Sequence, residues 1–157
     1  MANTILPEEE LIDFLKPRLK VLGFKEKGKR WTKVSGDFTL VFFIQGSSFS
    51  SDIYYIRPGV FINDCPGKEF YYYGHFNTEF KQTDPQQIWD NTLSFFTEWT
   101  DKELIQCRAR AFTEWEKRNP VEKRRSGEVD YEADPVPSYV FFGIRDAEMD
   151  YILNTLE

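Results

Sequence analysis

Three runs of apolar and aromatic residues between positions 38 and 80 dominate the hydrophobic pattern of this chain. They span residues 38–45 (FTLVFFIQ), 53–62 (IYYIRPGVFI) and 70–80 (FYYYGHFNTEF), and segments rich in Gly, Ser, Asp and Pro separate them. β-branched and aromatic residues are typical of strands, and runs of this length suit strands better than helices. We therefore expect three strands in this part of the chain.

Successive side chains of a strand point to opposite faces, so each run divides into two sides. The first run is apolar on both sides, which is typical of a central strand covered on both faces. In the other two runs one side is apolar and predicts a core face: Tyr54, Ile56, Val60 and Ile62, and Phe70, Tyr72, Phe76 and Phe80. The opposite side is aromatic with polar residues among the rings: Tyr55, Arg57 and Phe61, and Tyr71, Tyr73 and His75. This mixed face is the surface at which the sequence predicts binding.

Helical periodicity frames the strands on both sides. Residues 7–22 place leucines along one side of a helix, with Pro17 predicting a kink or a division into two short helices. Residues 84–99 begin with Asp84 and Pro85, and a second helix that starts with a capping box at Thr100 runs to residue 119. We expect this helical pair to cover one face of the sheet.

The remaining segments complete a predicted architecture. Residues 30–34 predict an edge strand, and residues 121–137 are charged, contain proline and predict a long exposed loop, either ordered or mobile. Residues 139–144 fit a strand or the start of a helix, and residues 149–156 fit a short final helix. We predict a single α+β domain over residues 1–157, with an antiparallel sheet of four to five strands, an N-terminal helix and a C-terminal helical layer on one face.

The charge of the chain is unevenly distributed. Residues 1–33 contain 8 Lys and Arg against 5 Asp and Glu, net +3, whereas residues 34–157 contain 12 against 21, net −9. An acidic body argues against nucleic acid as a partner, because phosphate binding depends on a basic surface. The aromatic content of 17% exceeds what an ordinary core needs, so some rings are expected on a surface that recognises a partner.

Cysteine and hydropathy patterns bear on the compartment. Cys65 and Cys107 are the two cysteines, far apart and without a nearby Cys or His partner, which is typical of a reducing environment and leaves a single disulfide bridge as the alternative. The N-terminus lacks the basic and apolar regions of a signal peptide, and no run of 18 apolar residues occurs. We expect a cytoplasmic protein without a membrane partner.

The candidates for chemistry are weak. His75 is the single histidine, the carboxylates follow no catalytic or metal-ligand spacing, and no cofactor motif is present, so we expect no catalytic residue, no metal and no cofactor. The leading hypothesis is a non-enzymatic module that binds another protein through the mixed face or the acidic surface, for example an immunity-type inhibitor of a basic partner. The alternative is a hydrolase or small-ligand protein with a pocket at the sheet face that uses Arg57 and His75. A third reading has the mixed face buried by residues 138–157, with no ligand.

The order of motifs resembles a bacterial family, domain of unknown function 4304. The resemblance rests on the Leu22-Gly23-Phe24-Lys25 helix end, the Trp31 strand, the Ile44-Gln45 strand end with its Ser-rich loop, and residues 55–62 (YIRPGVFI). It covers about residues 8–120. The resemblance implies an α+β domain and no established activity.

Overall fold

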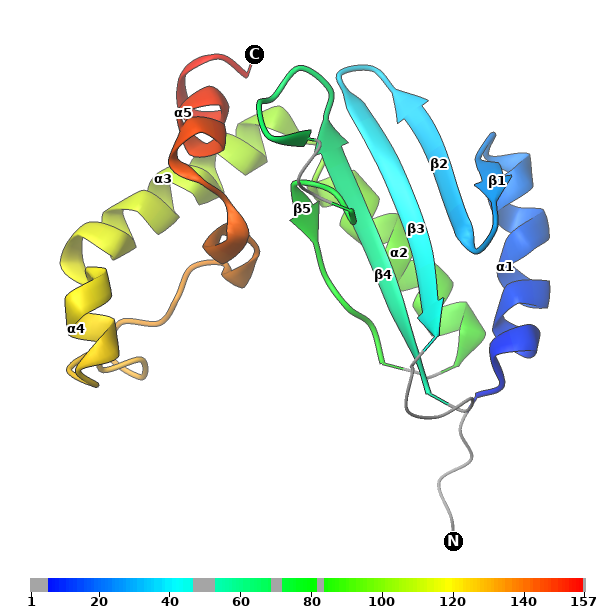
Figure 1. Ribbon diagram of the computed structural model, residues 1–157, viewed down its shortest axis with the longest axis horizontal. Coiled ribbons are helices and arrows are strands. Elements are labelled where there is room, and N and C mark those ends of the chain that lie inside the picture. The colour runs from blue at the N-terminus through cyan, green and yellow to red at the C-terminus, as the bar shows by residue number, and fades with distance from the viewer. Residues whose placement is uncertain (1–5, 47–52, 69–71, 82–83, 157) are drawn as a thin grey trace, which may run out of the picture.

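The computed structural model describes residues 6–46, 53–68, 72–81 and 84–156. Five antiparallel strands form one sheet in the order β1-β2-β3-β4-β5, and helices precede and follow them (Figure 1). The strands are β1 (Lys25–Lys27), β2 (Arg30–Ser35), β3 (Phe38–Gly46), β4 (Tyr54–Ile62) and β5 (Phe76–Asn77). The helices are α1 (Glu8–Val21), α2 (Pro85–Glu98), α3 (Lys102–Arg118), α4 (Val121–Arg125), the 3₁₀ helix η2 (Tyr139–Gly143) and α5 (Asp146–Asn154). The predicted α+β class and the antiparallel sheet are confirmed.

The long strands β3 and β4 form the centre of the sheet. They pair along their whole length, from Phe38 opposite Ile62 to Gly46 opposite Tyr54, so their even-numbered residues share one face. On that face Phe42, Ile56 and Val60 are fully buried, which confirms the predicted core side of β4. Helices α1 and α2 lie against this face (Figure 1) and contribute buried leucines and aromatic rings to the same core.

Helix α1 is continuous through Pro17, so the predicted division into two helices did not occur. Leu11, Leu15 and Leu19 are fully buried, and this burial holds the helix on the sheet although the proline removes one backbone donor. The helix ends before Gly23, whose φ of 92° is a backbone conformation that glycine adopts without steric strain. The Gly23 N–H donates to the Lys20 carbonyl and the Phe24 N–H to the Leu19 carbonyl, the paired bonds of a Schellman motif.

The start of α3 differs from the prediction. Asp101 is the cap, and its carboxylate accepts a hydrogen bond of 3.1 Å from the Leu104 N–H. Thr100 instead donates its hydroxyl proton to the Phe96 carbonyl, so the capping box expected at Thr100 is wrong. Aspartate is a stronger N-cap than threonine, which agrees with the start of α3 after Asp101. Helix α2 starts after Asp84 as predicted, but the Asp84 side chain makes no cap hydrogen bond, so a capping box of Asp84 with Gln87, which the sequence also predicts, is wrong.

The C-terminal segments form an arm beside the β5 edge of the sheet (Figure 1). The segment expected to be a long loop, residues 121–137, contains α4, and its later part is fixed to α3: the Trp115 Nε1–H donates to the Asp134 carbonyl at 2.9 Å. Residues 139–143 form the 3₁₀ helix η2, neither a strand nor an α-helix. The Phe141 ring of η2 is buried against Phe76 and Phe112, with ring centroids 5.8 and 5.6 Å away.

Candidate functional site on the open sheet face

Cross-strand pairing places arginines and aromatic rings in one row on the sheet face opposite α1 and α2. Arg30 of β2 pairs with Phe43 of β3, and Phe43 pairs with Arg57 of β4. Gln45 and Tyr55 form the next β3–β4 pair along the strands. Directly opposite residues in antiparallel strands point to the same face, so these side chains are neighbours.

The chain after β4 folds back over this face instead of continuing the ladder. The predicted third strand is therefore wrong over most of its length: β5 contains two residues, and one isolated bridge joins Ile56 to Phe80. A Cβ on Gly59 would lie 1.5 Å from the Tyr73 carbonyl oxygen, and a Cβ on Gly74 would lie 2.6 Å from the Val60 nitrogen. Two glycines thus allow one backbone to rest directly on the other.

This folding-back brings Tyr72 and Tyr73 onto the row of strand residues. The Phe43 ring lies edge-on to Tyr72, with centroids 5.1 Å apart, and 5.5 Å from Tyr73. The Arg30 guanidinium lies 5.5 Å from the centre of the Tyr72 ring, and the Arg57 guanidinium lies 4.8 Å from that of Tyr73, both within the range of cation–π attraction. We call Arg30, Phe43, Tyr55, Arg57, Tyr72 and Tyr73 the arginine–tyrosine cluster.

Two polar contacts hold the cluster in place. The Tyr73 hydroxyl donates to the Gln45 Oε1 at 2.7 Å. The Arg57 Nη2 lies 3.1 Å from the Glu79 Oε1, and the Arg57 guanidinium also stacks 5.4 Å from the centre of the Tyr55 ring. Tyr72 remains 58% exposed, while Tyr55, Arg57 and Tyr73 are partly buried. The cluster is therefore a surface held by polar contacts, and the Tyr72 ring is its exposed member.

His75 and Phe61 do not lie on this open surface, contrary to their predicted place on the mixed face. His75 is 2% exposed and Phe61 4% exposed, and their rings meet edge-on with centroids 5.7 Å apart. The Ile62 N–H donates to His75 Nδ1 at 3.0 Å, and His75 Nε2 lies 3.2 Å from the Pro66 carbonyl oxygen. Since Nδ1 accepts, Nε2 carries the proton and donates, so both ring nitrogens are used in holding the turn after β4.

Of the six residues predicted from sequence, the structure brings together Tyr55, Arg57 and Tyr73, and Tyr71 lies outside the described residues. The covering by residues 138–157 that the third reading required is not observed for the described residues, because residues 72–74 pack on this face instead. Sequence reasoning missed Arg30, Phe43 and Tyr72. A register for the β2–β3 pair would have found Arg30, whereas no local signal places Tyr72 on this side.

Other chemistry has little support in the part of the chain that the structure describes. No group of three or more His, Cys, Asp and Glu residues there could hold a metal ion. Both cysteines are free thiols, and burial together with the nearby Glu148 charge raises the pKa of Cys65 to about 12. No described helix has both the length and the apolar composition needed to span a membrane.

Comparison with known proteins gives one match. Residues 15–111, more than half of the chain, match the family described as "Domain of unknown function (DUF4304)". The chain belongs to this family. The DUF4304 match begins within α1 and ends within α3, so it contains the whole sheet and the whole arginine–tyrosine cluster, and it leaves α4, η2 and α5 outside. No curated protein and no solved structure matches the chain.

Proposed function

We propose that this protein is a non-enzymatic protein-interaction module that binds its partner through the arginine–tyrosine cluster. The observation that carries the proposal is the 58% exposed Tyr72, held between the Arg30 guanidinium and the ring of Phe43 on the face opposite α1 and α2. Tyrosine and arginine are enriched among the residues that dominate binding energy. Rings already supported by neighbours lose little conformational freedom on binding, which favours affinity.

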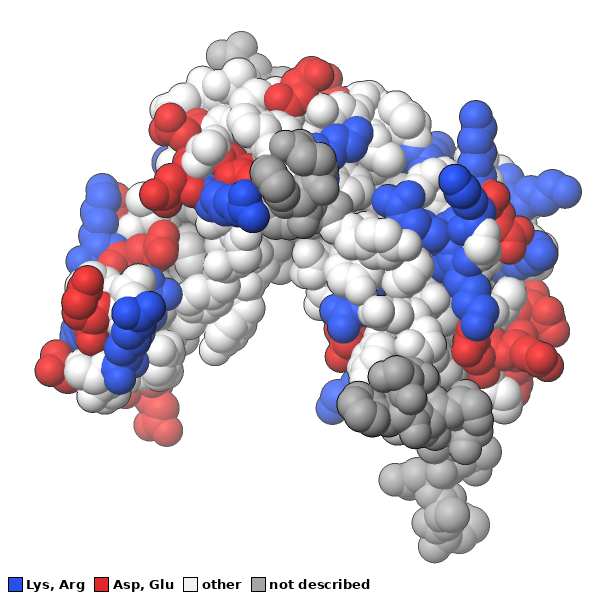
Figure 2. Space-filling view, in the orientation of Figure 1, with Lys and Arg blue, Asp and Glu red and all other residues white. Residues whose placement is uncertain are grey.

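The concrete form that we propose is an immunity-type inhibitor of a basic partner. Residues 84–157 contain 16 Asp and Glu against 9 Lys and Arg, a net charge of −7. These residues form α2 and the arm, and the surface is hollowed between the arm and the sheet (Figure 2). A basic partner at this hollow would meet net negative charge on the arm side and tyrosine rings on the sheet side. Opposite charge accelerates and orients such an association.

The alternative of a hydrolase or small-ligand protein that uses Arg57 and His75 gains no support from the contacts. Both ring nitrogens of His75 form hydrogen bonds with backbone groups. Arg57 contacts other residues, namely Tyr55, Tyr73 and Glu79. A general acid or base must reach the proton it transfers, and a fully engaged, buried imidazole does not.

The test is capture by three immobilised full-length proteins from extracts of the source cells. They are the wild type, a Tyr72→Ala/Arg57→Ala variant, and a Val21→Ala/Lys25→Ala control that removes an exposed apolar and an exposed basic residue of α1 and β1, away from the cluster and the arm. Urea unfolding of each protein shows whether all three are folded. A protein captured in this way is then purified, and its Kd for the three baits is measured by calorimetry.

The proposal expects a partner with a Kd that rises at least about tenfold in the cluster variant and stays unchanged in the control. Capture of nothing, or of proteins whose Kd is equal for all three baits, would contradict it. A captured protein of acidic character would contradict the immunity-type form while leaving the cluster as a binding surface.

A further inference from the structure

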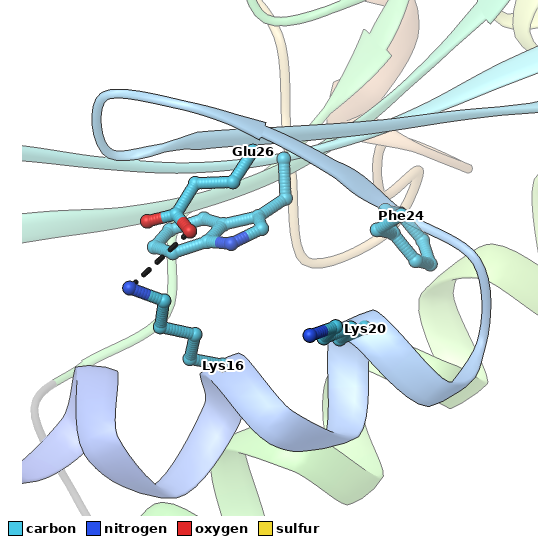
Figure 3. A pocket seen from close by; sticks show the side chains of 5 residues that line it. Lys16, Lys20, Phe24 and Glu26 are labelled. Carbon is cyan, nitrogen blue, oxygen red and sulfur yellow. Dashed lines mark ion pairs between the residues drawn. The ribbon is translucent and has the colours of Figure 1, made fainter.

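A cavity of about 250 Å³ lies between α1 and the β1–β2 hairpin, on the other side of the sheet from the arginine–tyrosine cluster. Its lining residues are Lys16, Lys20, Phe24, Glu26 and Trp31. Figure 3 shows the two lysines on α1 and Phe24 and Glu26 on the facing segment, on opposite sides of a common space. The cavity is separate from the proposed interaction surface and does not depend on it.

The wall of this cavity contains a donor without a protein partner. Trp31 is 2% exposed, held on the core side of β2 opposite Phe42. Its indole N–H has no protein acceptor among the described residues, and its nitrogen is not one of their buried unpartnered atoms, so the N–H is open to the cavity. Because the Trp31 side chain lines the cavity, a ligand in the cavity is placed to supply the acceptor.

The charges around the cavity favour an anion. Lys16 is engaged by Glu26, with 3.4 Å between Nζ and Oε2 (Figure 3). Lys20 has no ion-pair partner in the described parts of the chain. Among the lining residues two lysines therefore stand against one carboxylate, that of Glu26.

The other part of the wall is flat and apolar. The Phe24 and Trp31 rings supply it, and both residues are buried. Pockets for drug-sized molecules measure about 300–1,000 Å³, so a cavity of this size admits one ring with a small substituent. A ligand that satisfies every feature needs an apolar ring, a hydrogen-bond acceptor and a negative charge.

We propose that this cavity binds a small aromatic carboxylate. Its ring lies along Phe24 and Trp31, and its carboxylate accepts the Trp31 indole proton and pairs with the Lys20 ammonium. A carboxylate is the simplest group that serves as acceptor and anion at once, and a hydrogen bond to an ionised acceptor is stronger than one between neutral groups.

Benzoate is the probe for the experiment, with full-length ¹⁵N-labelled protein observed by NMR. The chain has 4 tryptophans, so four indole N–H signals are available, and the Trp31→Phe variant identifies the signal of Trp31. Through-space contacts to Phe42 give the same assignment if that variant does not fold. Benzamide serves as a neutral probe of nearly the same shape, and acetate as an anion without a ring.

The proposal expects a saturable shift of the Trp31 indole signal with benzoate, and weaker binding of benzamide and acetate. Lys20→Gln weakens benzoate binding by roughly three- to tenfold, because one exposed charge is removed from the site. Lys27→Gln, on exposed β1 outside the cavity, leaves the Kd unchanged. An unshifted Trp31 signal, equal binding of benzamide, or an unchanged Kd in Lys20→Gln would overturn the proposal.

Discussion

Replacing Gly59 with alanine tests the contact on which the whole cluster depends, the backbone of residues 73 and 74 lying directly on β4. An alanine Cβ at this position would lie 1.5 Å from the Tyr73 carbonyl oxygen, 2.7 Å from the Tyr73 carbonyl carbon and 3.3 Å from the Phe76 carbonyl oxygen. All three are backbone atoms, so no side-chain rotation relieves the clash. Either the strand and the covering segment move apart, or the covering segment lifts off.

The expected cost follows from either response. Overpacking of a close contact costs about 1–3 kcal/mol. Lifting off loses the Tyr73–Gln45 hydrogen bond, about 1 kcal/mol, and the ring contacts of Phe43 with Tyr72 and Tyr73, about 0.5–1.5 kcal/mol each. Alanine gains about 0.5–1 kcal/mol over glycine within a strand. The Gly59→Ala protein should therefore unfold with a free energy about 2 kcal/mol lower than that of the wild type.

Urea denaturation followed by circular dichroism measures this difference. The matched control is Gly46→Ala, at the end of β3, where a Cβ meets no heavy atom within 4 Å. We expect the control to keep or raise the free energy of unfolding, by at most about 1 kcal/mol. If the covering segment, residues 72–74, lifts off, the Tyr73→Phe substitution lowers the free energy of unfolding less in the Gly59→Ala protein than in the wild type. Equal stability of the Gly59→Ala and Gly46→Ala proteins would refute the contact.

Three further predictions concern single side chains. A thiol reagent at pH 8 should modify Cys107 alone in the folded protein, since the pKa of Cys65 is raised to about 12 and the thiolate is the reactive form; mass spectrometry showing two labels before unfolding would contradict this. His75→Ala should lower the free energy of unfolding by about 2–4 kcal/mol, because the Ile62 N–H is left without its acceptor; an unchanged urea midpoint would be the contrary result. Hydrogen bonds from Arg118 and Asn119 hold the pKa of Asp134 below its ordinary 3.8. The ionised carboxylate therefore stabilises the folded state fully above that pH, and this stabilisation is lost as the pH falls through the lowered pKa. Asp134→Ala should therefore increase proteolysis within residues 126–137 at neutral pH, and the wild type should show the same release of this segment, measured by amide exchange, only in acid.

The parts of the fold that sequence reasoning predicted are those that local patterns encode. Alternation along residues 38–62 reports which side chains are buried, because every second residue of a strand meets the same helices. Gly23 ends α1 for a reason visible in the sequence, since a glycine tolerates the positive φ that ends a helix. These features require no knowledge of distant residues.

The errors arose where contacts between distant residues decide the structure. Residues 70–80 have the composition of a strand, but Gly59 and Gly74 permit a backbone contact that leaves the ladder after two residues. This contact moves Tyr72 from the predicted core side to the open face and buries His75. Alternation cannot report a chain that turns over its own strand, so the place of Tyr72 on the open face could not be predicted from the sequence.

The Phe141 ring shows that the region matched by the family does not contain all of the core on which it depends. The DUF4304 match stops at residue 111, yet this ring from far downstream fills the space among Phe76, Trp99 and Phe112. A truncation at the family boundary would halt α3 partway and leave two of those rings, at the margin of the sheet, facing water. The tail after residue 111 thus completes the interior of a unit whose name is assigned to the part before it.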